Sequence, residues 1–192
     1  MNDINIQIQA DEEQNGTTVT YPYAGLFRRI MAYFIDYFIV AIPINILSDV
    51  VFAIRKIPIN SILAAVNDML QNPQNYAVEE MLPMLMPVYI TQMFITGTIT
   101  WLYYALMESS KLQGTLGKKL LGMTVLTDTG KRLTFLRATA RYFSKILSSM
   151  TFGIGYLLIA FTRKKQALHD LVACTVIVKR PVVKIIIDDN DF

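Results

Sequence analysis

The sequence is poor in the residues that carry metal and disulfide chemistry: among its 192 residues, Cys174 is the only cysteine and His169 the only histidine. A single cysteine cannot form a disulfide within the chain, and we interpret Cys174 as a small apolar residue of a strand. The two side chains are also too few for a zinc site, so neither a metal nor a cofactor is expected. No nucleophile, base and acid form a catalytic set, and we therefore predict that the chain is not an enzyme.

Charge is scarce as well. Charged residues make up 17% of the chain, against roughly 25% in soluble domains, whereas 53% of the residues are hydrophobic. We interpret residues 1–22, which contain no Lys or Arg, as an acidic disordered tail and residues 181–192 as an acidic C-terminal tail. The chain has a net charge of +3, and its basic residues lie almost entirely between the two tails; no aromatic-studded basic platform for binding nucleic acid is present.

Two long apolar runs indicate an α-helical membrane protein. Residues 26–47 contain Asp36 near their middle, and residues 88–107 contain no charged residue. Each run has about the 20 residues that a helix needs to cross the roughly 30 Å hydrocarbon core. In the intervening loop, residues 48–87, the apolar residues between positions 59 and 70 recur at helical spacing and predict a short amphipathic helix.

The distribution of basic residues predicts the orientation. Arg28 and Arg29 precede the first apolar run, whereas the loop 48–87 offers only Arg55 and Lys56. The segment after the second run carries Lys111, Lys118, Lys119, Lys131 and Arg132. By the positive-inside rule we expect a multi-pass protein of the cell inner membrane, with a cytoplasmic N-terminus and an extracytoplasmic loop 48–87.

Residues 135–162 have two interpretations. They are apolar in their second half, yet basic residues flank them on both sides, so a single crossing would break the positive-inside rule. A helical hairpin that turns at Gly153 and Gly155 would keep both ends in the cytoplasm. In such a hairpin Arg137, Arg141 and Lys145, spaced four apart, would form one stripe facing the lipid phosphates.

A small cytoplasmic β element favours the hairpin. The stretch "GMTVLTDTGKRLTF" is typical of a strand, a turn and a second strand, and "CTVIVKR" is typical of another strand. A sheet that joins these strands requires both of them on one side of the membrane. The predicted fold is therefore two transmembrane helices, a third span or helical hairpin, and a small cytoplasmic sheet.

The charge inside the first apolar run is the main candidate for a functional site. Arg29 and Asp36 are seven residues apart, which places them on nearly the same face of a helix. A carboxylate in the bilayer costs a few kcal/mol and needs a partner. Asp36 is either an ion or proton site with Arg29 as its charge partner, or one half of a structural contact.

A second candidate lies in "QALHDL", residues 166–171. Asp170 either forms a charge pair with Arg29 at the cytoplasmic end of the first helix or caps a turn and neutralises nearby basic residues. The ordinary pKa of histidine is near neutrality, so His169 is either a pH sensor or a simple hydrogen-bonding residue.

Three stretches resemble the RDD family of small bacterial membrane proteins, named for one arginine and two aspartates. They are "YAGLFRRIMAYFID", "QGTLGKKLLGMTV" and "RKKQALHDLVACTVIV", in that order. The resemblance implies a membrane domain over residues 23–180, with Arg29 as the family arginine and Asp36 and Asp170 as its aspartates. The loop 48–87 looks long for the family, which suggests an insertion that binds a partner.

The resemblance implies transport, since some members are proposed to exchange sodium for protons. We therefore predict ion transport of the Na⁺/H⁺ type that uses Asp36. The alternative is a non-catalytic membrane scaffold or subunit that docks a protein partner. The expected partners are membrane lipids, Na⁺ or H⁺, and a second copy of the chain or a membrane partner protein, but not nucleic acid.

Overall fold

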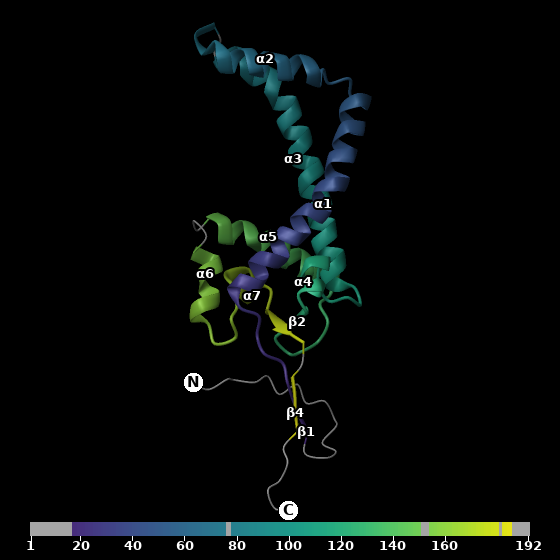
Figure 1. Ribbon diagram of the computed structural model, residues 1–192, viewed down its shortest axis with the longest axis vertical. Coiled ribbons are helices and arrows are strands. Elements are labelled where there is room, and N and C mark those ends of the chain that lie inside the picture. The colour runs from purple at the N-terminus through teal and green to yellow at the C-terminus, as the bar shows by residue number, and fades with distance from the viewer. Residues whose placement is uncertain (1–16, 76–77, 151–153, 181, 186–192) are drawn as a thin grey trace, which may run out of the picture. The chain divides into compact units, whose positions relative to one another are not determined.

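The computed structural model describes residues 17–75, 78–150, 154–180 and 182–185, which are mostly helical (Figure 1). The elements are β1 (Thr17–Thr20), α1 (Leu26–Ile54), α2 (Ile59–Gln71), the 3₁₀ helix η1 (Pro73–Asn75), α3 (Val78–Ser109), α4 (Leu116–Leu120), β2 (Met123–Thr127), α5 (Phe135–Met150), α6 (Ile154–Phe161), α7 (Leu168–Val172), β3 (Thr175–Lys179) and β4 (Val182–Ile185). The chain forms two compact units, one of residues 38–100 and one that combines the segments before and after them.

The two helices α1 and α3 are long and apolar enough to cross a membrane, over Leu26–Ile54 and Leu82–Ser109. Only 11% and 6% of the residues in their most apolar windows are buried. They therefore expose their apolar side chains, unlike the core helices of a soluble protein. Both predicted spans are confirmed as helices, and each helix extends beyond the predicted run.

In the unit of residues 38–100, the predicted amphipathic helix is present as α2. None of its residues is buried. Its apolar side chains include Leu63 and Leu70, which are 65% and 72% exposed. The apolar stripe of α2 is therefore not used to stabilise a core within this unit.

The described residues 135–150 and 154–162 contain no single helix long enough to span a membrane. They are divided between α5, with 16 residues, and α6, with 8 residues, and a helix of 8 residues is only about 12 Å long. The two helices pack together: a Cβ atom added at Gly155 would lie 2.9 Å from the Cα of Ser148. The expected turn at Gly153 lies outside the described residues, so the helical hairpin stays a prediction.

The expected sheet is present, but one of its expected strands is missing. Strand β2 pairs antiparallel with β3, with Val125 opposite Ile177, which confirms that the two predicted β-rich stretches join. The second strand expected after the turn at residues 128–130 does not form. Instead β3 pairs with all five residues of β2, and Leu133 is buried in the core.

Parts of the two expected tails also pair with each other. Strands β1 and β4 are antiparallel, with Val19 opposite Val183 (Figure 1). The prediction of a disordered segment over residues 1–22 is therefore wrong for residues 17–20. Residues 1–16 and 186–192 lie outside the described residues.

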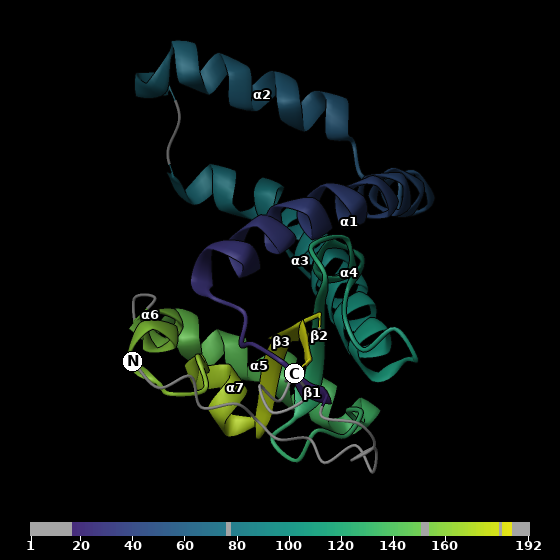
Figure 2. The same ribbon diagram turned by 60° about the horizontal axis from the view of Figure 1, so that its bottom comes forward.

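Alanine provides four of the eight buried residues in the described core cluster that positions the site. Ala32 of α1, Ala105 of α3 and Ala138 of α5 are each at most 1% exposed, and they pack with Met123 and Ile177 of the sheet. Small residues allow helix backbones to approach closely, as at helix interfaces in membranes. The core thus brings the first turns of α1 and the last turns of α3 close to the β2–β3 sheet. Figure 2 shows β2 beside β3, with α7 and α5 next to them.

Candidate functional site

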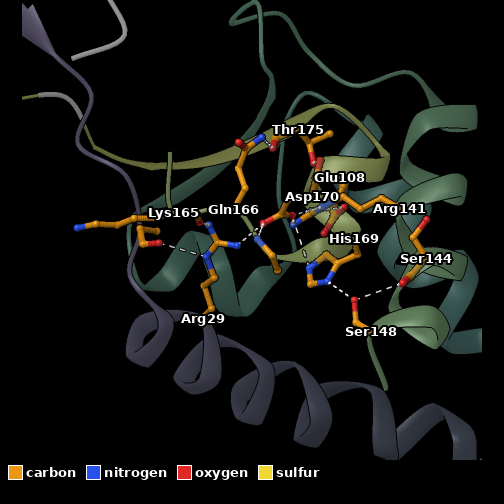
Figure 3. Close-up of polar contacts among 12 residues, drawn as sticks. Arg29, Glu108, Arg141, Ser144, Ser148, Lys165, Gln166, His169, Asp170 and Thr175 are labelled. Atoms are coloured by element: carbon orange, nitrogen blue, oxygen red, sulfur yellow. Dashed lines mark hydrogen bonds and ion pairs between the residues drawn. The ribbon is translucent and has the colours of Figure 1, made fainter. Parts of the chain in front are cut away.

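Five charged side chains from five different helices meet in one buried cluster, and Figure 3 labels four of them, Arg29, Glu108, Arg141 and Asp170. The five are Arg29 of α1, Glu108 of α3, Lys118 of α4, Arg141 of α5 and Asp170 of α7. None of these side chains is more than 9% exposed. We call these five residues the charge cluster.

Asp170 is the acceptor for both arginines. Its Oδ1 accepts hydrogen bonds from Nε and Nη2 of Arg141 at 2.9 and 2.6 Å. Its Oδ2 accepts one from Nη1 of Arg29 and one from the backbone N–H of Ala167, at 3.2 Å in the latter case. Arg29 also donates to the carbonyl of Lys165 at 2.6 Å. Asp170 thus forms the charge pair with Arg29 and caps the first turn of α7 at the same time.

The arginine pair also sets the ionisation of Asp170. Burial raises the pKa of the Asp170 carboxyl, but the positive charges of Arg141 and Arg29 outweigh that effect and hold the pKa well below its usual range. Asp170 is therefore a charged acceptor at every physiological pH.

Glu108 connects the remaining members of the cluster. Its Oε2 accepts a hydrogen bond from Nη1 of Arg141 at 2.8 Å, and its Oε1 accepts one from Nζ of Lys118. Arg141 therefore bridges Glu108 and Asp170. Arg29 binds only Asp170 among these carboxylates. The cluster therefore holds two carboxylates and three basic side chains.

Asp36 has partners of another kind. Its Oδ1 accepts hydrogen bonds from the Tyr103 hydroxyl and the Gly117 backbone N–H, both at 2.7 Å, and its Oδ2 accepts one from the Thr115 hydroxyl at 2.5 Å. The residue is only 1% exposed. Asp36 thus fastens α1 to the beginning of α4 and to α3.

Of the two partners left open for Arg29, the structure shows Asp170 and not Asp36. Among the residues that the structure describes, no cation lies within ion-pair distance of Asp36. Arg29 lies two turns earlier on α1, where its guanidinium reaches Asp170 and the carbonyl of Ala24. Tyr103, Thr115 and Gly117 provide enough donors to satisfy the buried carboxylate without a positive charge.

The expected basic stripe on α5 is wrong. Arg137 is exposed, but Arg141 is 1% exposed and belongs to the charge cluster. The Nζ of Lys145 lies 3.8 Å from the centre of the Tyr104 ring, in a cation–π contact. Four-residue spacing places side chains on one face, but it does not indicate whether that face is turned towards lipid or towards protein.

Sequence reasoning did not assign Glu108, Lys118 and Arg141 to the site. One signal could have identified Glu108, because it is the first charge after the apolar run 88–107. A carboxylate at that position lies at the end of a spanning helix and needs a partner. Nothing in the spacing of Lys118 and Arg141 indicates that they share that partner.

His169 lies beside the cluster without being charged. Its Nδ1 is 3.3 Å from the Ser148 hydroxyl and its Nε2 is 3.5 Å from Oδ1 of Asp170 (Figure 3). Burial lowers the pKa of His169 to about 3, and the opposing charge of Asp170 does not offset this. A histidine with that pKa stays neutral near pH 7, so the geometry argues against a pH sensor.

This burial predicts how stability depends on pH. As the pH falls below about 6.5, the unfolded histidine binds a proton that the folded His169 excludes until the pH approaches its pKa of about 3. His169 should therefore lower the free energy of unfolding by up to about 1.4 kcal/mol per pH unit in that window. Thermal midpoints of His169→Gln in detergent should depend less on pH between 7 and 5 than those of the wild type. Equal slopes would contradict the burial of a neutral imidazole, since the chain has no other histidine.

Known proteins are similar to the chain over most of its length. The family model described as RDD family matches residues 23–174, which include Arg29, Asp36 and Asp170. The chain is also 38% identical over 155 residues to "Uncharacterized protein YxaI" of Bacillus subtilis (strain 168). That match covers 81% of this chain and 96% of the relative. No solved structure matches the chain significantly.

Proposed function

Since this chain belongs to the RDD family, we propose that its arginine and two aspartates are structural locks in a non-enzymatic membrane scaffold. In this proposal α1 and α3 cross the cell inner membrane, and the N-terminus and the β2–β3 sheet are cytoplasmic. The locks hold α4, α5 and α7 against the spanning helices. The scaffold then offers a fixed surface to a membrane partner protein.

One observation carries the proposal: all six oxygens of Asp36, Glu108 and Asp170 already accept hydrogen bonds from protein donors. A bound cation would need oxygen ligands that are free to turn towards it. The charge cluster also has one more cation than anion, so its field disfavours a further positive ion.

The energetics of buried ion pairs support a locking role. Such pairs add little net stability compared with well-packed apolar residues, but breaking one leaves an uncompensated charge at a large cost. A network that joins five helices therefore penalises every arrangement in which one helix is displaced. Precise placement of helices is what a docking surface requires.

Helix α2, which the locks do not join, is a separate candidate docking element for the partner. It belongs to the long loop between the spanning helices and has no buried residue. Its stripe of apolar side chains is not used within its own unit. Deleting residues 59–70 should therefore abolish recovery of a stable complex in mild detergent, whereas unchanged recovery would exclude α2 as the contact.

Ion transport is the second candidate function. The observation in its favour is the presence of two buried carboxylates, Asp36 and Glu108, on helices that are long enough to cross a membrane. A transport cycle would require Asp36 to release Tyr103 and Thr115 and to bind an ion in their place. That exchange is a testable difference between the two functions.

A flux experiment distinguishes the scaffold function from ion transport. Purified chain is reconstituted in proteoliposomes, and proton movement is followed after a sodium gradient is applied. We expect no sodium-dependent flux from well-inserted wild type, because the carboxylates are occupied by protein donors. Sodium-dependent flux that is lost in Asp36→Asn but kept in Asp49→Asn would overturn the scaffold proposal in favour of transport. Asp49 is a matched control, since it is an exposed carboxylate on the same helix.

A further inference from the structure

Helix α5 has the reverse of the pattern found on a surface helix of a soluble protein. Its inward face carries Arg141, which is 1% exposed, and Ser148, which is 0% exposed. Its outward face carries Leu136 at 77%, Phe143 at 50% and Ile146 at 54% exposure. A surface helix in water turns its apolar stripe to the core and its polar face outwards. The surroundings of α5 must therefore be apolar.

Helix α6 extends this outward apolar surface. Leu157 and Phe161 are 52% and 83% exposed, whereas Ile159 is 4% exposed and packs inwards. Because Gly155 lies against Ser148, α6 stays in close contact with α5. Both helices of the hairpin therefore carry large exposed apolar side chains, of the kind that mark contact with a membrane or a partner when they gather on one surface.

The contacts of α5 with α3 show which part of α3 lies beside α5. The indole Nε1 of Trp101 donates to the Thr139 hydroxyl at 3.3 Å, and the Trp101 ring lies 6.2 Å from that of Phe143. The rings of Tyr104 and Tyr142 are also 6.2 Å apart. Trp101 lies eight residues before the end of α3, or about 12 Å along the helix axis. Helix α5 therefore lies beside a part of α3 that belongs to the candidate span.

We propose that the α5–α6 hairpin is an in-plane membrane element, whose outward apolar face is embedded in the acyl chains of one leaflet. This inference rests on the membrane placement of α1 and α3 in the proposed function. Basic residues flank both ends of the hairpin, where lipid phosphates would lie. They are Arg132, Arg137, Arg163, Lys164 and Lys165.

The contact between α5 and α3 identifies lipid as the surroundings of the outward apolar face. Helix α5 contacts α3 through Trp101 and Tyr104, so the two helices share one environment at that depth. Helix α6 is too short to cross the bilayer, and a hairpin returns the chain to the side from which it entered. The basic flanks then both face the headgroups of the same leaflet.

Spin-label accessibility tests this assignment. In a Cys174→Ser background, which removes the only native thiol, nitroxides are attached at Leu136→Cys, Phe143→Cys and Leu157→Cys. The labelled chains are reconstituted in vesicles of phosphatidylcholine and phosphatidylglycerol. We expect collisions with oxygen to exceed collisions with a water-soluble nickel chelate at all three positions, because oxygen partitions into acyl chains.

Two control positions keep the outcomes distinguishable. Ile42→Cys, on the apolar surface of α1, should report lipid, and Lys131→Cys, in the exposed turn after β2, should report water. Nickel access at Phe143→Cys with lipid at Ile42→Cys would overturn the embedded hairpin and leave the membrane placement intact. Nickel access at both would overturn the proposed function as well. Spin–spin broadening at Phe143→Cys would overturn the assignment to lipid, because it would show a second copy on this face.

A second measurement tests the hairpin topology. Arg137→Cys and Arg163→Cys, both at exposed positions that flank the hairpin, are labelled with a membrane-impermeant maleimide in intact and permeabilised cells. We expect both to react from the same side of the membrane. Reaction from opposite sides would overturn the in-plane hairpin and establish a single crossing.

Discussion

Replacing Asp170 by asparagine should lower the free energy of unfolding by about 3–5 kcal/mol. The substitution keeps the shape of the side chain but removes the negative charge that Arg29 and Arg141 share. Arg29 then has no carboxylate partner among the described residues, while Arg141 keeps only Glu108. The measurement is thermal or denaturant unfolding of the purified protein in detergent.

A matched control and a second substitution make this test specific. Asp128→Asn, in the exposed turn after β2, should change stability by less than about 0.5 kcal/mol. Adding Arg29→Gln to Asp170→Asn should recover part of the loss, because it removes one of the unpaired charges. Equal stability of Asp170→Asn and Asp128→Asn would contradict the locking role of the cluster.

Replacing Gly117 by alanine should lower the free energy of unfolding by about 1–3 kcal/mol. A Cβ atom at this position would lie 2.3 Å from the carbonyl oxygen of Ala32 and 2.9 Å from Oδ1 of Asp36. The Ala32 oxygen belongs to the backbone of α1 and cannot rotate away, so α4 must move. That movement would break the 2.7 Å hydrogen bond from Gly117 N–H to Asp36.

Gly97→Ala is the matched control for this substitution. Gly97 lies within α3, and a Cβ atom there would have no neighbour within 4 Å. Alanine is favoured over glycine in a helix by up to about 1 kcal/mol, so this variant should be as stable as the wild type or more so. Thermal midpoints of the two variants in the same detergent provide the comparison. A Gly117→Ala protein as stable as Gly97→Ala would show that α4 is not held against α1.

The sequence by itself determined the candidate membrane-spanning helices and the signature residues. A run of about 20 apolar residues buries its polar backbone in lipid only as a helix, which is why α1 and α3 follow directly from residues 26–47 and 88–107. Asp36 stands out for the same reason, since a carboxylate in such a run needs a partner. The β-rich stretches around Val125 and Ile177 also form strands that pair with each other, as predicted.

Only the tertiary structure decided which charge meets which. Arg29 is separated from Asp170 by 141 residues, and local spacing favoured the nearer Asp36. The structure instead gives Asp36 the donors of Tyr103, Thr115 and Gly117. Long-range pairing depends on which donors and acceptors the packing of the helices brings together. The spacing of residues along one helix does not encode that.

The orientation of α5 was likewise decided by packing. Helical periodicity separates an apolar face from a basic face in the same way whichever of them is turned inwards. In water the apolar face would be buried, but here Arg141 is buried against Glu108 and Asp170 while Leu136 and Phe143 are exposed. The physical reason is that the carboxylates of Glu108 on α3 and Asp170 on α7 require cations, and Arg141 on the basic face of α5 supplies one.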